Sequence, residues 1–225
     1  MAGRYDLDDL GQGDGLLITI EGIGGSGKTT LARGLAGWLT SQGLAVTVTK
    51  EPGGTALGKH LRALLLEGDE LPSWSEAFLF EADRSLTYSE IIHPALERGD
   101  VVISDRNLYG TIAYQGFGAG LDVDLIDRMN AAATQGVYPD LVLVLDLPPE
   151  VAVERLSRGG IGDRFDKRAA SFQTRVREGY LFAARRDASR ARILDASQPV
   201  SSVSQAAARL VAVALKRQHP DLVSP

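Results

Sequence analysis

Cysteine is absent from this chain of 225 residues, and histidine occurs only three times. The absence of cysteine excludes disulfide bonds, thiolate nucleophiles and cysteine-ligated zinc, and the histidines have no spacing that fits a zinc site. No segment approaches the ~20 consecutive apolar residues that a membrane-spanning helix needs. The first residues lack the basic start and apolar core of a signal peptide. We therefore expect a soluble cytoplasmic protein without a membrane partner.

An excess of positive charge is also lacking. The 24 Lys and Arg residues are outnumbered by 29 Asp and Glu residues, and the net charge is -5. This balance argues against a general binding surface for a nucleic-acid polymer. It does not exclude small anionic substrates, because a local cluster of arginines can hold a phosphate on an acidic protein.

Short apolar runs alternate with longer segments of helical periodicity. Strands are predicted at 16–21, 45–49, 101–104, 141–145 and 191–194. Helices are predicted over 31–39, 57–66, 76–96, 122–134, 151–156, 166–188 and 200–215. This alternation predicts an α/β fold with a five-stranded parallel sheet and helices on both faces. We expect one domain over 16–217, a flexible extension over 1–15 and a tail over 218–225.

The most specific motif follows the first predicted strand and precedes the first helix. The run Gly22-Ile23-Gly24-Gly25-Ser26-Gly27-Lys28-Thr29-Thr30 satisfies the G-x-x-x-x-G-K-[ST] pattern of a P-loop NTPase fold. Its backbone N–H groups would surround the phosphates of ATP, Lys28 would reach the β- and γ-phosphates, and the Thr29 hydroxyl would help to hold Mg²⁺. The expected nucleotide-binding residues are Gly22, Gly25, Ser26, Gly27, Lys28, Thr29 and Thr30. The motif does not identify a reaction, because GTPases, motor ATPases and small-molecule kinases share it.

Two loops at the ends of predicted strands narrow the class. Residues 50–55, Lys-Glu-Pro-Gly-Gly-Thr, form a tight loop after the second strand, and residues 104–107, Ser-Asp-Arg-Asn, end the third. Open parallel sheets bind ligands at this edge, where Asp105 can meet Mg²⁺ and Arg106 can meet a phosphate. The pair indicates a site for phosphate transfer.

A third segment, residues 158–165, is rich in glycine and lies between two predicted helices. It predicts a short mobile lid near 157–166. Closure of this lid would exclude water and bring Arg158 and Arg164 to the transferring phosphoryl group.

With these motifs in place, the sequence resembles the thymidylate kinase family over 16–196. The matching elements are Glu21-Gly22-Ile23, Glu51-Pro52-Gly53-Gly54-Thr55, Ala82-Asp83-Arg84, Asp105-Arg106, Ala113-Tyr114-Gln115-Gly116, Pro139-Asp140-Leu141, Asp163-Arg164-Phe165 and Val176-Arg177-Glu178-Gly179-Tyr180-Leu181. Their common order and spacing make the resemblance specific. It implies a phosphotransferase that moves the γ-phosphate of ATP to a pyrimidine deoxynucleoside monophosphate, first of all dTMP to dTDP, and that works as a homodimer.

The resemblance also implies roles for single residues. Phe80 would stack on the pyrimidine, Arg84 would hydrogen-bond the base edge, and Tyr114 would lie beside the 2′ position of the sugar. The implied substrate-binding residues are Lys50, Glu51, Pro52, Phe80, Arg84, Arg106, Thr111, Tyr114 and Gln115. The implied catalytic residues are Lys28, Asp105, Arg106, Arg158 and Arg164, with Thr29 and Asp105 at the metal.

Each of these roles has a structural alternative. Phe80 and Tyr114 also suit an apolar core, and Arg84 also suits a helix surface beside an acidic neighbour. Arg158 and Arg164 also suit a solvated loop.

Four positions depart from the family pattern. Gly24 stands where the family usually has an acidic residue that contacts the 3′-hydroxyl, and Lys50 stands where an arginine is common. Thr87 replaces a histidine, and Asn107 replaces an aromatic residue. Because all four lie in or near the expected acceptor pocket, the alternative is a kinase of the same fold for a modified nucleotide or another phosphorylated metabolite. A non-catalytic nucleotide-binding protein is a further alternative.

Overall fold

The computed structural model describes residues 15–159, 162–166 and 168–218. These residues contain a parallel sheet of the five strands that the sequence predicted. Each strand begins and ends within one residue of its predicted bounds. The strands are β1 Leu16–Glu21, β2 Val46–Lys50, β3 Val101–Asp105, β4 Leu141–Asp146 and β5 Ala191–Asp195. They lie side by side in the order β2-β3-β1-β4-β5. Most of the predicted extension and tail, 1–14 and 219–225, lies outside the described residues.

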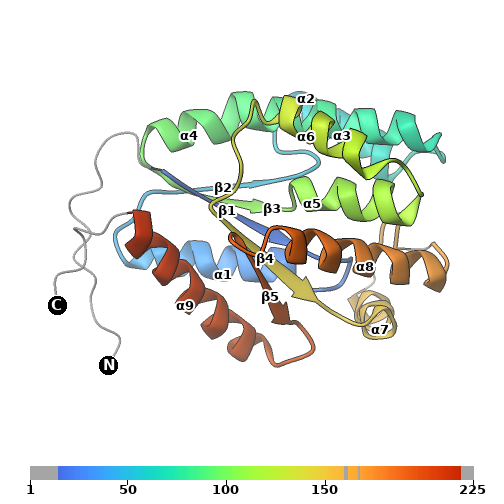
Figure 1. The fold of residues 1–225 in the computed structure, drawn as a ribbon. Helices are drawn as coiled ribbons and strands as arrows, with labels where there is room; N and C mark the ends of the chain where they lie inside the picture. Colours follow the sequence, from blue (N-terminus) through green and yellow to red (C-terminus); the bar gives the residue numbers. More distant parts are fainter. Residues whose placement is uncertain (1–14, 160–161, 167, 219–225) are drawn as a thin grey trace.

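Helices cover both faces of this sheet, as predicted (Figure 1). Helix α1 (Lys28–Ser41) and helix α9 (Val200–Gln218) lie on one face, and α4 (His93–Glu97) and α8 (Ala170–Arg186) lie on the other. The remaining α-helices are α2 Ala56–Leu66, α3 Ser73–Thr87, α5 Leu108–Thr111, α6 Val123–Ala133 and α7 Pro149–Gly159. None of the helices in the described ranges is both long and apolar enough to span a bilayer.

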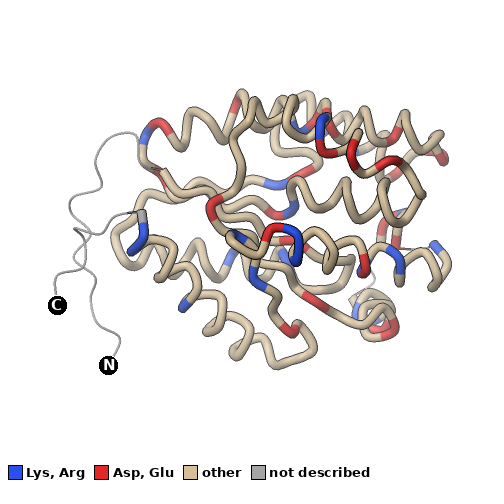
Figure 2. Tube along the Cα trace, viewed as in Figure 1, with Lys and Arg blue, Asp and Glu red and all other residues tan. Residues whose placement is uncertain are grey.

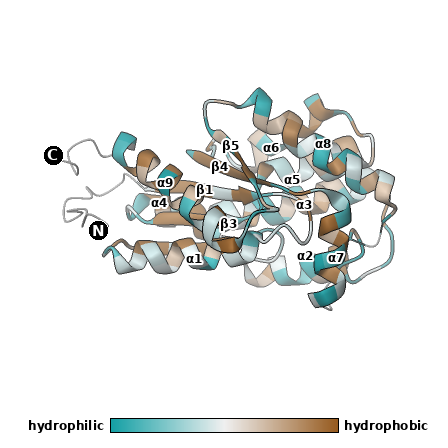
Figure 3. Ribbon diagram, turned by 90° about the horizontal axis from the view of Figure 1, so that it is seen from below, coloured by the Kyte–Doolittle hydropathy of each residue, from teal (hydrophilic) through white to brown (hydrophobic). Residues whose placement is uncertain are grey.

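The core follows from the apolar strands. Every residue of β1 is buried, and so are the first five of β4. Figure 3 shows these strands as a hydrophobic centre between helices whose outer surfaces are mostly hydrophilic. Strands that are buried on both faces need near-continuous apolar runs, which is why the sequence located them accurately.

The helix predicted over 76–96 is divided in the structure. Helix α3 passes into a π-helical turn, η1 (Tyr88–Ile92), and then into α4. Pro94 lies in the first turn of α4. Because proline has no N–H to give to the preceding turn, the helix changes its hydrogen-bond pattern before it.

The sequence did not predict the helical segment over 108–118. It consists of α5 followed directly by the π-helical turn η2 (Ile112–Gly118). Its glycines disfavour a helix by intrinsic propensity. Tertiary packing against α8 compensates: a Cβ at Gly118 would lie 2.8 Å from the Phe172 ring, and one at Gly179 would lie 2.7 Å from Ala113 Cα. Glycines on both helices thus allow an approach that larger residues would block.

The strands share one further feature that positions the site. Each of them ends in a charged residue, namely Glu21, Lys50, Asp105, Asp146 and Asp195. In a parallel sheet these ends meet at one edge, so the charge collects there. Elsewhere Lys and Arg are interspersed with Asp and Glu along the chain (Figure 2).

Candidate active site

The phosphate loop has the backbone that its glycines predict. Gly22, Gly25 and Gly27 have φ angles of 141°, 73° and 95°, a region that residues with a side chain rarely adopt. Gly27 is the N-cap of α1, so the loop leads directly into the N-terminus of a 14-residue helix. Free N–H groups and the helix dipole make this end of α1 a site for anions.

Lys28 lies inside the loop. Its ammonium group donates a hydrogen bond of 2.9 Å to the carbonyl of Ile23, and the side chain is buried. Burial, together with the nearby Arg106 guanidinium, lowers the pKa of Lys28 to about 8. No carboxylate of the described chain forms an ion pair with Lys28, so its charge is available for a phosphate.

Thr29 and Asp105 come together as the sequence predicted. The Thr29 hydroxyl donates a hydrogen bond of 2.5 Å to Asp105 Oδ2. No group of three or more His, Cys, Asp or Glu side chains of metal-site geometry occurs in the described ranges. One hydroxyl and one carboxylate suit Mg²⁺, which keeps several waters and binds mainly to substrate phosphates.

Arg106 follows Asp105 in a strained conformation, with a φ of 78°. Such a backbone costs about 1–3 kcal/mol and is a common feature of functional sites. In this conformation the guanidinium lies over the ring of Tyr114, 5.0 Å from its centroid. We find no hydrogen bond from this guanidinium to any described residue.

A buried polar network holds the Arg106 turn. Glu21 Oε1 accepts hydrogen bonds from the backbone N–H groups of Asn107 (2.9 Å) and Tyr109 (3.1 Å), whereas Oε2 is buried without a partner among the described residues. Burial raises the pKa of Glu21 to about 7. Glu21 thus fixes the path of the chain immediately after Arg106.

Asn107 connects this turn to the loop after β2. Its Nδ2 donates to Glu51 Oε1 at 3.0 Å, and its Oδ1 accepts from the Tyr88 hydroxyl at 3.1 Å. Burial raises the pKa of Glu51 to about 8, against the opposing charge of Arg84. The sequence marked Asn107 only as a departure, and the structure shows that it is a completely buried organiser of the site.

Arg84 is the centre of the same network rather than a surface residue. Its Nε donates to Glu51 Oε2 at 2.9 Å, and its Nη1 has three acceptors, Glu81 Oε1, Thr111 Oγ1 and Asn130 Oδ1, at 2.5, 3.0 and 2.6 Å. Nη2 donates to the carbonyl of Asn107 at 3.0 Å. One Nη2 hydrogen therefore remains for a ligand.

Seven of the predicted substrate residues line one small cavity. The lining residues are Glu51, Phe80, Arg84, Arg106, Gly110, Thr111, Tyr114, Gln115 and Phe165. Its volume is about 10 Å³. That space holds about one water molecule and is far too small for a pyrimidine.

The cavity is small because Phe165 fills it. The Phe165 ring is 5.9 Å from Phe80 and 5.5 Å from Tyr114 between centroids, and it is 2% exposed. Arg164 donates to the carbonyl of Leu65 and to Glu76 Oε2, and its guanidinium lies 4.5 Å from the Phe165 ring. Phe80 and Tyr114 are thus both core residues and cavity residues, and a base would have to displace Phe165.

A larger pocket of about 550 Å³ lies on the other side of the phosphate loop. Its walls come from the loop residues Gly25 and Gly27, from Arg155 on α7 and from residues 196–200 after β5. Arg155 Nη2 donates to the carbonyl of Ala196 at 2.9 Å, which joins the two walls. Sequence reasoning missed this part of the site, because only the sheet brings residues 155 and 196–200 next to the loop.

The structure does not bring every predicted site residue to the phosphate loop or the acceptor cavity. Arg158 lies in the last turn of α7, 77% exposed, and pairs with Glu154 at 2.5 Å. Lys50 ends β2 and is exposed. The predicted lid is therefore helical up to Gly159, and residues 160–161 lie outside the described residues.

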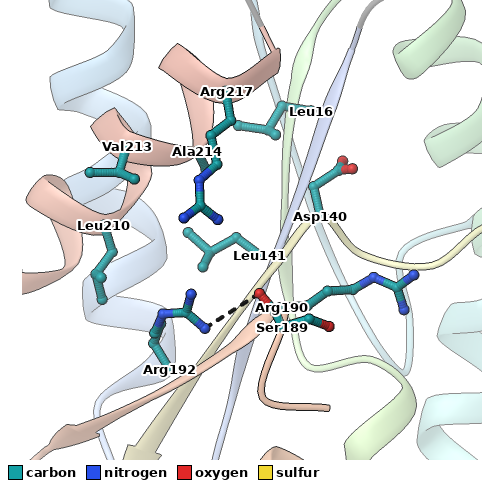
Figure 4. A pocket seen from close by; sticks show the side chains of 10 residues that line it. All are labelled: Leu16, Asp140, Leu141, Ser189, Arg190, Arg192, Leu210, Val213, Ala214 and Arg217. Atoms are coloured by element: carbon teal, nitrogen blue, oxygen red, sulfur yellow. Dashed lines mark hydrogen bonds between the residues drawn. The ribbon is translucent and has the colours of Figure 1, made fainter.

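A further pocket of about 330 Å³ lies at the opposite edge of the sheet, where β1 begins (Figure 4). Leu16, Asp140 and three arginines line it. Arg192 donates to the carbonyls of Ala188 (2.8 Å) and Ser189 (3.5 Å), and Arg190 pairs with Asp187. These guanidinium groups support the turn before β5, far in the fold from the phosphate loop.

Known proteins resemble the chain over almost its whole length. A family model described as thymidylate kinase matches residues 20–207. A thymidylate kinase of Nitratidesulfovibrio vulgaris is 42% identical over 209 residues, which are 89% of this chain and 93% of that protein. One from Oleidesulfovibrio alaskensis is 46% identical over 191 residues, 81% of this chain and 90% of that protein.

A solved structure agrees. The crystal structure of thymidylate kinase from Ehrlichia chaffeensis superposes with a TM-score of 0.73 at 33% identity, covering 88% of this chain and 98% of that one. A phosphate loop leading into α1, an arginine at the end of β3 and an aromatic cavity beside it thus occur in a sequence that matches one family throughout. The chain belongs to the thymidylate kinase family.

Proposed function

We propose that this protein transfers the γ-phosphate of ATP to dTMP and forms ADP and dTDP. The observation that carries the proposal is the Arg106 guanidinium, which lies between the phosphate loop and the aromatic cavity without a hydrogen-bond partner among the described residues. A partly buried cation at the end of a central strand favours an anionic ligand. The phosphate of the acceptor nucleotide fits this position.

The donor nucleotide belongs on the other side of the loop. The pocket of about 550 Å³ beside Gly25 and Gly27 has the size of a small-molecule site, and it opens onto the N-terminus of α1. Lys28 would exchange its bond to the Ile23 carbonyl for a phosphate oxygen of ATP. Thr29 and Asp105 would hold Mg²⁺, which neutralises phosphate charge when bound.

The reaction needs positioning more than proton transfer. An oxygen of the acceptor phosphate, already charged at neutral pH, attacks the γ-phosphorus, and the bond between γ-phosphorus and the β–γ bridging oxygen breaks to release ADP. Arg106 would orient the attacking phosphate, and Lys28 would stabilise the charge on the phosphoryl group. Glu21 and Asn107 would not touch the substrate and would act indirectly, by holding the Arg106 turn in place.

The acceptor cavity must open for this reaction. Phe165 occupies the space between Phe80 and Tyr114, so entry of a base requires the Phe165 ring to leave this space. This requirement supports the predicted lid, although its arginines are not yet at the phosphate loop. Arg158 and Arg164 stay candidates for contact with the transferring phosphoryl group in the state in which both nucleotides are bound.

A panel of acceptors tests the proposal. Purified protein with ATP and Mg²⁺ would receive dTMP, dUMP, UMP, dCMP or dGMP, and ADP release and the phosphorylated product would be measured. We expect dTMP to be the best acceptor and Arg106→Ala to lower its kcat/KM at least a hundredfold, with Arg128→Ala, an α6 residue to which we assign no role, as the control. ATP binding without turnover of any nucleotide would refute the proposal.

The homodimer is part of the same proposal. Leu57 and Leu64 lie two turns apart on the same side of α2, and Phe78 lies on the neighbouring α3. All three side chains are more than half exposed. Such apolar side chains favour burial against a second copy. Sedimentation analysis of wild type and Phe78→Asp tests it: a dimer that Phe78→Asp weakens is expected, and a monomeric wild type would contradict it. A cytoplasmic location stays a prediction that cell fractionation would test.

A further inference from the structure

Gly24, the departure from the family pattern that lies in the phosphate loop, stands against a carboxylate from another part of the chain. A Cβ placed on Gly24 would be 1.8 Å from Asp166 Oδ1 and 3.0 Å from Oδ2. The backbone of Gly24 is not in the left-handed region, so its conformation does not demand a glycine. Asp166 therefore fills the space that a side chain at position 24 would take.

The 163–166 turn holds Asp166 in this place. Asp163 Oδ1 accepts from the backbone N–H groups of Phe165 (2.8 Å) and Asp166 (3.1 Å), and Asp166 Oδ2 accepts from the N–H of Asp163 at 3.2 Å. We find no donor to Asp166 Oδ1 within the described part of the chain. One oxygen of the carboxylate is thus committed to the turn, and the other is available.

Asp166 lies between the two halves of the site, because its side chain meets Gly24 of the phosphate loop and the preceding residue, Phe165, lines the acceptor cavity. Lys28 and Arg106 are close enough to stabilise its anion, and Asp163 opposes them. Tyr114, on the wall of the acceptor cavity, is near enough to feel the Asp166 charge. The carboxylate therefore lies where a nucleotide would join its phosphate, on Arg106, to its base, in the cavity.

A carboxylate accepts hydrogen bonds and donates none. The only hydroxyl donors that a nucleoside monophosphate offers between phosphate and base are those of its sugar. We propose that Asp166 binds a sugar hydroxyl of the acceptor, the 3′-hydroxyl in dTMP, and so supplies from the lid the carboxylate that the phosphate loop lacks at Gly24. This inference rests on the proposed function and adds a substrate-binding residue to it.

The contact at Gly24 makes the two positions dependent on each other. Gly24→Asp alone would place two carboxylates in one space, so both nucleotide binding and the seating of the turn should suffer. The double variant Gly24→Asp with Asp166→Ala returns to a single carboxylate. We expect it to recover activity that each single variant loses.

The decisive measurement is kcat/KM for dTMP and for 3′-deoxy-dTMP with wild type, Asp166→Ala, Gly24→Asp and the double variant. Hydrogen bonds to charged groups are strong, so Asp166→Ala should lower the value for dTMP about tenfold or more and change that for 3′-deoxy-dTMP less than about twofold. Asp69→Ala, an exposed carboxylate on another loop, is the matched control. Calorimetry of ATP binding shows whether each variant is folded.

An equal loss with both nucleotides, or a double variant worse than either single one, would overturn the inference while leaving dTMP kinase activity in place. A changed Mg²⁺ requirement without selectivity between the nucleotides would also overturn it. Wild-type protein that binds ATP and phosphorylates neither nucleotide would instead refute the proposed function, and the inference with it.

Discussion

Glu21 offers the most direct test of the buried network behind the phosphate loop. Burial raises the pKa of this carboxyl from 4.5 to about 7, while three nearby cations and the backbone N–H of Tyr109 oppose the rise. The variant Glu21→Gln keeps an oxygen for the N–H groups of Asn107 and Tyr109 and removes the titrating group. A comparison of the two proteins therefore isolates one ionisation.

The sign follows from proton binding. The folded pKa lies above the unfolded one, so the folded state binds more protons between them, and the contribution of Glu21 to stability falls as the pH rises from about 4.5 through about 7. At 1.36 kcal/mol for each pH unit, the loss is about 3 kcal/mol for this completely buried group.

Urea denaturation followed by circular dichroism, at intervals from pH 5 to pH 9, measures this loss. The free energy of unfolding of wild type minus that of Glu21→Gln should decrease by about 2–3 kcal/mol over this range and level off above pH 8. The buried amide of the variant adds a constant offset, which does not affect the slope. Parallel curves for the two proteins would refute the assignment of a raised pKa to Glu21.

Three other variants test the site. Lys28→Met keeps the buried stem and removes the charge, so kcat should fall about 10²–10³-fold with little loss of stability. The control variant Lys59→Met, on the exposed face of α2, should behave as wild type. A fall in kcat of less than tenfold for Lys28→Met would contradict the role of Lys28. Arg84→Met leaves Glu51 and Glu81 buried without their cation, so urea denaturation should show a destabilisation of about 3–5 kcal/mol, and a change below about 1 kcal/mol would show that the network is not held by charge. Phe165→Ala should lower the free energy of unfolding by about 3 kcal/mol but not raise KM for dTMP, because the ring occupies the acceptor cavity; a tenfold higher KM would mean that Phe165 itself binds the nucleotide.

The sequence alone determined the elements whose physics is local. Strands buried on both faces must be apolar throughout, so their positions could be read to within one residue. The phosphate loop was equally plain, because its glycines are needed for backbone angles that few other residues adopt. Asp105 and Arg106 could be placed beside it because the ends of neighbouring parallel strands meet at one edge of the sheet.

Only the tertiary structure decided the rest. The helix over 108–118 depends on close packing against α8, which outweighs the low helix propensity of its glycines. Asn107 and Arg84 became the centre of a buried network because residues from four separate segments converge on one point, namely residue 51, residues 81 and 84 of one helix, residue 107 and residue 130. The space above Gly24 is filled by Asp166, 142 positions along the chain. Contacts between residues so far apart leave no periodicity in the sequence, because they follow from how the helices and loops pack on the sheet.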